Sequence, residues 1–513
     1  MPRALLSVHD KTGLAELGHA LASMGWDLVA SGGTAKALSE AGLFVTSLER
    51  VTNHPEMLGG RVKTLHPAIH AGILARDTPE DMDTLREFNY APIAMVVCNL
   101  YPFQETITKQ GVTLEDAIEQ IDIGGVTLLR AAAKNFSRVI VLSSPGDYSS
   151  VTARLRDKGV VDADTRRDLA VKAFQHTRDY DTVIHAYLAS LSPASSLSDE
   201  LPDTFSLDVF KVEDLRYGEN PHQRAAIYAT GNSQGRVLGG QILGGRSLSY
   251  NNILDLDAAW NASELFEEPT VVIVKHLTPC GIASGSTIAS AFPAALASDP
   301  VSAYGGVIAV NRKVDQAFVQ ALGDLFVEAI AAPSFEPEAQ EVLAAKRKNC
   351  RLLCIDAQEE RPAVEVRGVR GGVLLQTPDT GDPEDTHWKV VSKRQPTEAE
   401  LEALHFAWKA CQFVKSNAIV LAVKDATVGI GGGLPSRVDA AKLAVEKAGE
   451  KSKGSVMASD AFFPFPDSIE VGATAGVTAI VAPGGSIRDD QAIAAADTAN
   501  IAMVFTGVRH FRH

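Results

Sequence analysis

Long apolar runs and an excess of basic residues are both missing from this sequence. No apolar stretch approaches the length of a membrane span, and the opening MPRALLSVHDKTG turns polar too early for a signal peptide. Lys and Arg number 48 against 63 Asp and Glu, and the formal net charge of −15 disfavours a nucleic-acid-binding surface. We therefore expect a cytoplasmic protein that binds no membrane and no nucleic acid, and whose partners are small molecules.

Cysteine is also scarce, and the pattern of possible metal ligands is incomplete. Five scattered cysteines cannot form a paired disulfide framework, and Cys350 and Cys354 have no nearby Cys or His to complete a zinc set. His66 and His70 have the spacing of a helical metal pair, but Pro67 lies between them and no acidic third ligand is evident. The sequence predicts no bound metal.

The length of 513 residues is too great for a single hydrophobic core. Short apolar runs (ALLSV, DLVA, IAMVVCNL, RVIVLSS) alternate with helix-like segments in the first part, which predicts a doubly wound parallel sheet of the α/β class. Between about residues 190 and 204 the text SLSPASSLSDELPD has no apolar period and indicates an exposed connection. We predict two domains, 1–198 and 199–513.

The second part contains a faint internal repeat. ASDPVSAYGGVIAVN from Ala297 and ASDAFFPFPDSIEVG from Ala458 share a small-Ser-Asp opening that precedes an aromatic residue and an apolar run. The pair predicts two similar α/β subdomains with a site between them, and chance similarity is the alternative.

One candidate site follows the apolar run VVIVK at residues 271–275. The composition predicts a strand buried on both faces, and the carboxyl ends of strands in α/β proteins are where ligands bind. Lys275 and His276 lie at this end, and Pro279 and Gly281 force a turn directly afterwards. The pair offers a proton acceptor beside a cation, and a strand that simply runs into solvent is the alternative.

A second candidate site is predicted where a strand runs into a helix in DLVASGGTAKAL. The segment Ser31, Gly32, Gly33 and Thr34 offers unpaired backbone N–H groups and two hydroxyls, an arrangement that suits a phosphate monoester. The glycine spacing matches neither a nucleoside-triphosphate loop nor a dinucleotide fingerprint. A plain turn with a helix cap is the alternative.

Further along the first part, four side chains form a candidate proton-transfer group. Lys63 lies in GGRVKTLHPAIHAGIL, Tyr101 follows a buried strand in VVCNLYPF, and Asp122 and Lys134 flank a helical pattern in IDIGGVTLLRAAAKN. We expect two lysines, a phenol and a carboxylate in one pocket, with no metal ligand and no activated nucleophile. Such a set suits charge stabilisation and proton transfer in an addition or condensation at a carbonyl.

Twelve segments spread over the chain together resemble one family. They are SVHDKTGL, SGGTAKAL, GGRVKTLHPAIHAGIL, NLYPF, IDIGGVTLLRAAAKN, RYGENPHQ, SYNN, VKHLTPCG, SDPVSAYGG, KSNAIVL, SDAFFPFPD and RHFRH. The sequence resembles the bifunctional purine-biosynthesis enzymes that join AICAR transformylase to IMP cyclohydrolase. The resemblance implies formyl transfer from 10-formyltetrahydrofolate to AICAR by the second domain, and dehydrative closure of the product FAICAR to IMP by the first.

The same resemblance implies further properties of the molecule. The first domain is expected to be methylglyoxal-synthase-like and the second to consist of two cytidine-deaminase-like subdomains without zinc. Folate is expected as a co-substrate with no bound cofactor, and the active form is expected to be a homodimer.

The family's catalytic residues match Lys275 and His276 for transfer, and Lys63, Tyr101, Asp122 and Lys134 for cyclisation. The positions that match its substrate-binding residues are Ser7, Lys11, Ser31, Gly32, Gly33, Thr34, Arg61, Thr64, Arg216, Tyr217, Asn417, Arg437, Asp467, Arg509, Phe511 and His513. Within this set the resemblance implies that the residues around Ser31–Thr34 receive the ribose phosphate and that Asp467 lies near the folate.

Three residues depart from the family pattern. His9 stands where the resemblance implies Ser, Leu434 where it implies Gln, and Glu328 where some relatives have Asp.

Two other functions remain as alternatives. A zinc-dependent deaminase would need a Cys/His metal set that the spacing does not supply. A nucleotide-binding regulatory module on the same scaffold would not need the Lys, His, Tyr and Asp that are retained.

Overall fold

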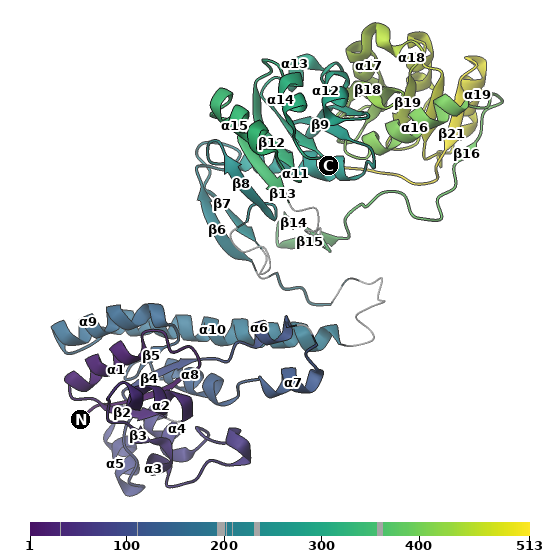
Figure 1. The fold of residues 1–513 in the computed structure, drawn as a ribbon. Coiled ribbons are helices and arrows are strands. Elements are labelled where there is room, and N and C mark those ends of the chain that lie inside the picture. The colour runs from purple at the N-terminus through teal and green to yellow at the C-terminus, as the bar shows by residue number, and fades with distance from the viewer. Residues whose placement is uncertain are drawn as a thin grey trace. The chain divides into compact units, whose positions relative to one another are not determined.

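The computed structural model describes residues 1–30, 32–109, 111–191, 201, 203–207, 209–229, 236–355 and 363–513. The chain divides into two compact units, Met1–Glu200 and Leu201–His513, which we call unit 1 and unit 2 and describe separately (Figure 1). The expected domain boundary at 198/199 falls in 192–200, outside the described residues.

Unit 1 contains a parallel sheet with the strand order β3-β2-β1-β4-β5. Its strands are β1 (Arg3–Val8), β2 (Asp27–Ala30), β3 (Thr46–Ser47), β4 (Met95–Asn99) and β5 (Ile140–Leu142). The central pair β1 and β4 is in register from Ala4 opposite Met95 to Val8 opposite Asn99. The strand order reverses beside β1, so the doubly wound parallel sheet predicted from the sequence is confirmed.

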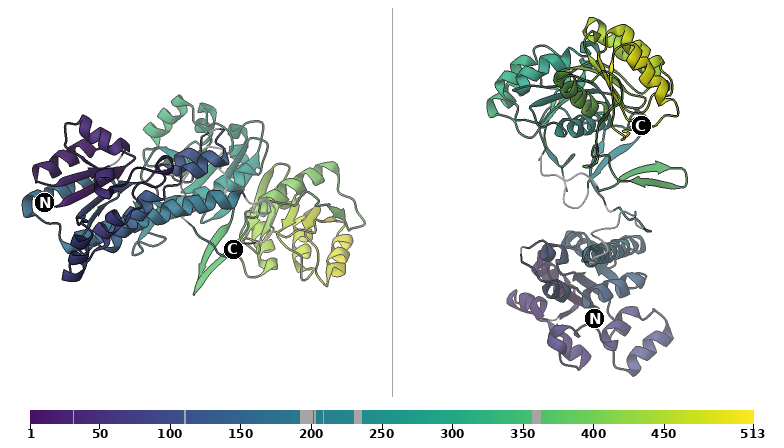
Figure 2. Two further views of the ribbon diagram at one scale, coloured as in Figure 1. Left: turned by 90° about the horizontal axis from the view of Figure 1, so that it is seen from below. Right: turned by 90° about the vertical axis from the view of Figure 1, so that its right-hand side faces the viewer.

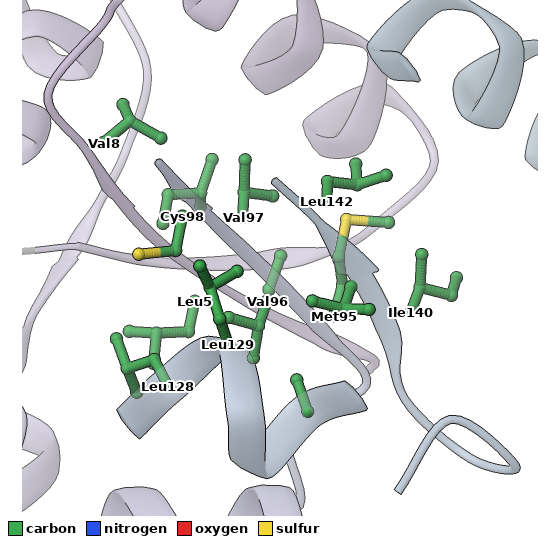
Figure 3. Close-up of a cluster of buried hydrophobic side chains, with 14 of the residues drawn as sticks. Leu5, Val8, Met95, Val96, Val97, Cys98, Leu128, Leu129, Ile140 and Leu142 are labelled. Atoms are coloured by element: carbon green, nitrogen blue, oxygen red, sulfur yellow. The ribbon is translucent and has the colours of Figure 1, made fainter. Parts of the chain in front are cut away.

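Helices cover both faces of this sheet, as right-handed crossovers require. They are α1 (Leu14–Ser23), α2 (Gly32–Glu40), α3 (Leu48–Thr52), α4 (Pro67–Leu74), α5 (Pro79–Glu87), α6 (Phe103–Ile107), α7 (Leu114–Glu119), α8 (Gly124–Lys134), α9 (Tyr148–Lys158) and α10 (Ala163–Ser190). Contacts join α1 to α2 and α9, and α8 to α4 and α10. Strand residues such as Leu5 and Val96 pack with Leu128 and Leu129 of α8 in the buried core (Figure 3).

Unit 2 is built on a large mixed sheet with the order β16-β21-β20-β19-β17-β18-β10-β9-β11-β12-β13-β8. Its strands are β8 (Gly240–Gly244), β9 (Thr270–Lys275), β10 (Thr278–Ser284), β11 (Gly306–Val310), β12 (Val327–Ala332), β13 (Arg351–Ile355), β16 (Lys389–Val390), β17 (Ile419–Val423), β18 (Ala426–Gly431), β19 (Val456–Ser459), β20 (Ala479–Ala482) and β21 (Ala502–Phe505). The buried run at 271–275 is the expected strand, β9.

The large sheet contains the same strand arrangement twice. In each half a hairpin, β9–β10 or β17–β18, is followed by an antiparallel neighbour and two parallel strands. The halves meet where β10 pairs antiparallel with β18, with Ala283 opposite Ala426. The two similar α/β subdomains expected from the sequence are therefore present.

The sequence repeat used to predict them is wrong in its alignment. Ala297 lies after a helix and before β11, whereas Ala458 lies within β19, so the two copies occupy different places. The structural repeat instead aligns VIVKHLTPCGIA (272–283) at the β9–β10 hairpin with VLAVKDATVGIG (420–431) at the β17–β18 hairpin. Each hairpin has a two-residue turn, 276–277 in the first and 424–425 in the second, and the ladder of each has a register shift at the same place.

Helices enclose both faces of the large sheet (Figure 1). They are α11 (Tyr250–Glu264), α12 (Ile288–Leu296), α13 (Pro300–Ala303), α14 (Gln316–Ala321), α15 (Pro337–Lys346), α16 (Glu398–Cys411), α17 (Arg437–Ala448), α18 (Asp467–Ala475) and α19 (Asp489–Thr498). Helices α11 and α16 share one core across both halves, while the opposite face has a separate core for each half. Val272 and Val274 face the shared core and Val271 and Ile273 the other, which explains an uninterrupted apolar strand.

Two hairpins complete unit 2. One is formed by β6 (Phe210–Leu215) and β7 (Ala225–Ala229), and the other by β14 (Glu365–Val369) and β15 (Gly372–Gln376). The β14–β15 hairpin extends away from the large sheet (Figure 2). No helix in the described part of the chain is long and apolar enough to cross a membrane.

Candidate active sites

Two lysine side chains converge on the first turn of α2 in unit 1. A Cβ atom built on Gly32 would lie 2.8 Å from Lys63 Nζ, and one built on Gly33 would lie 3.7 Å from Lys11 Nζ. Gly32 has a φ of +52°, a conformation that favours glycine. Two ammonium groups beside the backbone N–H groups of a helix start make this place electrostatically suited to an anion. Ser31 lies outside the described residues.

The other residues of unit 1 that are expected to bind the phosphate already make contacts within the protein. Thr34 is buried, and its hydroxyl accepts from Val8 N at 3.0 Å and donates to Val8 O at 3.1 Å. That side chain therefore anchors α2 to β1. Lys63 also pairs with Glu56 at 3.0 Å, which places a carboxylate beside its ammonium group.

Three further positions lie around these groups. Ser7 is half-buried on β1, Thr64 is buried against Gly124, and the exposed Arg61 forms an ion pair with Glu119. Thr64 therefore packs against the first residue of α8.

Asp122 lies immediately before α8 and is held there by backbone donors. Its Oδ1 accepts from Gly125 N at 2.7 Å, and the N–H groups of Tyr101 and Gly124 also point at the carboxylate. Burial raises the pKa of this carboxyl, and the three N–H groups oppose that rise. A carboxyl with a raised pKa is better suited to exchange a proton near neutral pH than an exposed one.

Tyr180 of α10 supports the Asp122 loop, a role that the sequence did not indicate. Its hydroxyl accepts from Asp122 N at 2.8 Å and donates to Gln120 O at 3.0 Å. Burial raises the pKa of Tyr180 to about 12, so this phenol stays protonated and serves as a fixed hydrogen-bond partner.

His9, one of the three departures from the family pattern, lies beside Tyr101. The two ring centroids are 5.1 Å apart, and Asn99 Oδ1 accepts from His9 N at 2.6 Å and from Asp10 N at 2.9 Å. The Tyr101 side chain is 50% exposed, so its hydroxyl remains accessible to a substrate. The structure thus brings an imidazole to the phenol at the carboxyl edge of the sheet.

Within one copy of the chain, Lys134 lies apart from Asp122 and does not share a pocket with it. Asp122 precedes α8, and Lys134 is the exposed last residue of the helix. Ten residues of α-helix span about 15 Å. Helix α8 also leads the chain back to the start of β5, so Lys134 lies at the opposite edge of the sheet from Asp122.

In unit 2, Lys275 is the last residue of β9, and His276 begins the two-residue turn that leads to β10. Lys275 Nζ donates to Tyr304 O at 3.1 Å and to Gly305 O at 2.8 Å, which fixes the ammonium group beside the start of β11. His276 is exposed, and its φ is +53°. The pair is therefore presented at the edge of the sheet, with the cation held in place.

Antiparallel pairing brings distant residues to this same edge. Because β10 runs antiparallel to β18, the start of β10 lies beside the end of β18, and β17 begins there as well. Asn417 precedes β17, and Arg437 begins α17 after β18. Arg437 is buried and donates to Asn417 Oδ1 at 2.7 Å, to Ser459 Oγ at 2.8 Å and to Asp460.

Leu434, the second departure, contributes through its backbone. Asn417 Nδ2 and N donate to Leu434 O at 2.9 Å and 3.1 Å, so the Asn417 side chain is fixed without a polar side chain at position 434. Glu328, the third departure, lies at the start of β12 and forms an ion pair with the buried Arg351.

The C-terminal segment after β21 ends at this same edge. Ser416 N donates to Arg512 O at 2.8 Å and His510 N to Asp460 O at 3.1 Å, which ties the segment to the Asn417 loop and to the end of β19. Arg509 lies 4.4 Å from the centre of the Phe511 ring, and the rings of Phe511 and His513 are 5.8 Å apart.

The buried side chain of His510 anchors the C-terminal segment through two carboxylates. The side chain is 2% exposed, and its ring nitrogens lie 2.7 Å from Asp379 and 2.8 Å from Asp382. Burial alone would lower the pKa of this imidazole, but the two carboxylates raise it to about 9. Within the motif RHFRH, roles were predicted for Arg509, Phe511 and His513. No sequence pattern distinguished the buried His510 from these residues.

The remaining predicted residues of unit 2 lie in two loops. Arg216 stacks over Tyr217 at 5.2 Å in the loop between β6 and β7, and Asn251 Nδ2 at the start of α11 donates to Glu219 O of this loop at 3.4 Å. Asp467 begins α18 after the loop that follows β19. Within the described residues, no group of three or more His, Cys, Asp or Glu side chains could hold a metal ion.

Together these features define a two-unit α/β enzyme in which each unit places cationic and proton-exchanging side chains at one edge of its sheet. The MGS-like domain model matches residues 13–127, and the AICARFT/IMPCHase bienzyme model matches residues 132–447. The chain therefore belongs to the AICARFT/IMPCHase bienzyme family, whose members combine AICAR formyltransferase with IMP cyclohydrolase activity.

Full-length relatives agree with this assignment. The chain is similar to the bifunctional purine biosynthesis protein PurH of Desulfitobacterium hafniense (49% identity over 517 residues), of Halalkalibacterium halodurans (50% over 514) and of Anoxybacillus flavithermus (49% over 514). Each alignment covers 100% of this chain and 99% of the relative.

Proposed function

We propose that unit 2 transfers the formyl group of 10-formyltetrahydrofolate to the amine of AICAR, and that unit 1 closes the product FAICAR to IMP with loss of water. The full-length identity of about 50% to PurH proteins carries this proposal. It is tested by turnover of AICAR with 10-formyltetrahydrofolate, following tetrahydrofolate, FAICAR and IMP separately. An enzyme that forms IMP without folate-dependent formylation would contradict it.

For transfer, the amine nitrogen of AICAR attacks the formyl carbon, and the bond from that carbon to the folate nitrogen breaks. His276 takes the proton released by the amine, and Lys275 stabilises the negative charge that develops on the formyl oxygen and helps to protonate the departing nitrogen. The support is the exposed imidazole beside an ammonium group fixed by two backbone carbonyls.

We propose that the nucleotide is bound by Arg216, Tyr217, Asn417, Arg437 and the C-terminal residues Arg509, Phe511 and His513. Asp467 lies near the folate in the same proposal. The network through Arg437 supports it, because that network keeps Asn417 and the C-terminal segment at the edge where His276 is presented.

For cyclisation, the carboxamide nitrogen attacks the formyl carbon, an oxyanion forms on the formyl oxygen, and that oxygen leaves as water. Lys63 stabilises the oxyanion, and Asp122 and Tyr101 move protons between the ring nitrogen and the departing oxygen. The ribose phosphate binds at Gly32 and Gly33 with Lys11. The support is the two ammonium groups at the start of α2 and the raised pKa of Asp122.

We propose that the active enzyme is a homodimer and that Lys134 serves the cyclisation site of the second copy. Its exposed position at the far edge of the sheet supports this, since it cannot reach Asp122 of its own copy. Mixing Lys134→Ala with Asp122→Asn subunits tests the proposal, because exchange would restore about one quarter of normal cyclisation. No restoration, or full activity of Lys134→Ala alone, would contradict it.

A further inference from the structure

The turn that presents His276 has a backbone that its own residues do not favour. His276 and Leu277 have φ values of +53° and +64°, the left-handed pair of a tight hairpin turn. Such turns usually contain Asn, Asp or Gly, which adopt positive φ most easily. With His and Leu in these positions, the conformation must be held by groups outside the turn.

Asp255 of α11 supplies that hold. Leu277 N donates to Asp255 Oδ1 at 2.7 Å, and the backbone N–H of His276 also points at this carboxylate. One side chain thus satisfies both donors of the turn. No sequence pattern indicates this contact, because Asp255 lies 21 residues before His276 in a helix that contains other acidic residues.

The position of α11 makes this hold rigid. The helix begins with a capping box in which Ser249 and Asn252 exchange hydrogen bonds of 3.2 Å, and it packs against β9, β11 and β12. Its first turn also contacts the Arg216–Tyr217 loop through Asn251. One helix therefore connects the nucleotide loop to the catalytic turn.

Asp255 also affects the charge of the turn. It is partly buried, which raises the pKa of its carboxyl, and the charges of His276 and Lys275 oppose that rise. When His276 takes the amine proton it becomes an imidazolium, and a nearby fixed carboxylate stabilises that cation.

We propose that Asp255 is a positioning residue for formyl transfer, which fixes the His276–Leu277 turn and so holds the His276 side chain beside Lys275. This rests on the proposed role of His276 as the proton acceptor. Asp255 acts through the turn and does not touch the substrate.

The test compares Asp255→Ala and Asp255→Asn with the unchanged enzyme. Asp255→Ala removes both the acceptor and the charge, and kcat for formyl transfer should fall by about 100-fold, as for a small displacement of a catalytic group. KM for AICAR should change much less. Asp255→Asn keeps an oxygen acceptor without the charge, so kcat should fall less.

The split between kcat and KM separates positioning from a general loss of structure. A displaced turn lowers kcat for formyl transfer, whereas the nucleotide keeps its own contacts and KM for AICAR changes little. Asp255→Asn keeps an acceptor for the N–H of Leu277 and should recover part of the kcat lost in Asp255→Ala. A kcat in Asp255→Asn no higher than in Asp255→Ala, or an undiminished kcat in Asp255→Ala, would overturn the proposal.

Two controls complete the design. Cyclisation of supplied FAICAR, which depends on unit 1, should stay normal in both variants. Asp257→Ala removes an exposed carboxylate that accepts a hydrogen bond from Asn261 on the same helix, and transfer should be unaffected.

His276→Ala is assayed in parallel: if it keeps full transfer activity, the proposed role of His276 as proton acceptor fails. If it is inactive while Asp255→Ala is fully active, only the positioning proposal fails.

Discussion

The two units reach a similar arrangement of charged side chains by different routes. In unit 1, the carboxyl ends of parallel neighbouring strands bring Lys11, Gly32 and Asn99 to one edge, each at or soon after the end of its own strand. In unit 2, the edge gathers a hairpin turn at His276 and a C-terminal segment at His510, more than two hundred residues apart. A site built from strand ends depends on local motifs, whereas one built across a pseudo-repeat depends on long-range register.

The largest effect should come from His276→Ala, which tests whether the two sites are independent. Formyl transfer should fall by about 10²- to 10⁴-fold, the loss expected for a general base, and cyclisation of supplied FAICAR should stay near normal. Both rates are measured on one preparation. A comparable loss of both activities in a folded variant would show that the sites are not separable.

Asp122→Asn is the matching change in unit 1. Cyclisation should fall by about 10²-fold or more, since the amide cannot exchange a proton in place of a carboxyl with a raised pKa. Formyl transfer should persist and FAICAR should accumulate. Normal IMP production would show that another group moves the proton.

A smaller effect concerns the anchoring of the C-terminal segment in unit 2. The pKa of His510 is about 9 in the folded chain against about 6.5 unfolded, so its stabilising contribution is complete below about pH 6.5 and is lost as the pH rises through about 9. The thermal midpoint of unit 2 should therefore fall over this range by several degrees more than in His510→Gln. Parallel pH dependence in the two proteins would disprove the charged anchor.

The smallest effect is expected from cleavage of the chain between about residues 195 and 203. Each unit has its own core, so the isolated N-terminal piece should fold and keep its proposed phosphate and proton-transfer residues. If Lys134 serves a second copy, cyclisation should persist as long as the isolated N-terminal piece still forms a dimer. A piece that is folded by circular dichroism and dimeric by sedimentation, yet inactive on FAICAR, would show that the site needs residues of unit 2.

Particular elements show how far sequence reasoning reached. The strands at 95–99 and 270–275 were predictable because both faces are buried, which leaves uninterrupted apolar runs. The segment DLVASGGTAKAL predicted a strand that runs into the helix α2, but no pattern showed that the Thr34 hydroxyl is committed to β1. The separation of Lys134 from Asp122 within one copy was not predictable, because it depends on a helix that runs between opposite edges of the sheet.

The sequence by itself determined the α/β class, the division into two parts and the family, because apolar periodicity and short motifs are local properties of the chain. Only the tertiary structure decided that the subdomain repeat lies at the β9–β10 and β17–β18 hairpins, that Tyr180 supports Asp122, and that Asp255 holds the His276 turn. These contacts join residues distant in the sequence through strand register and helix packing. No periodicity or motif records them, because a single buried carboxylate or phenol resembles any other until the fold places its partner beside it.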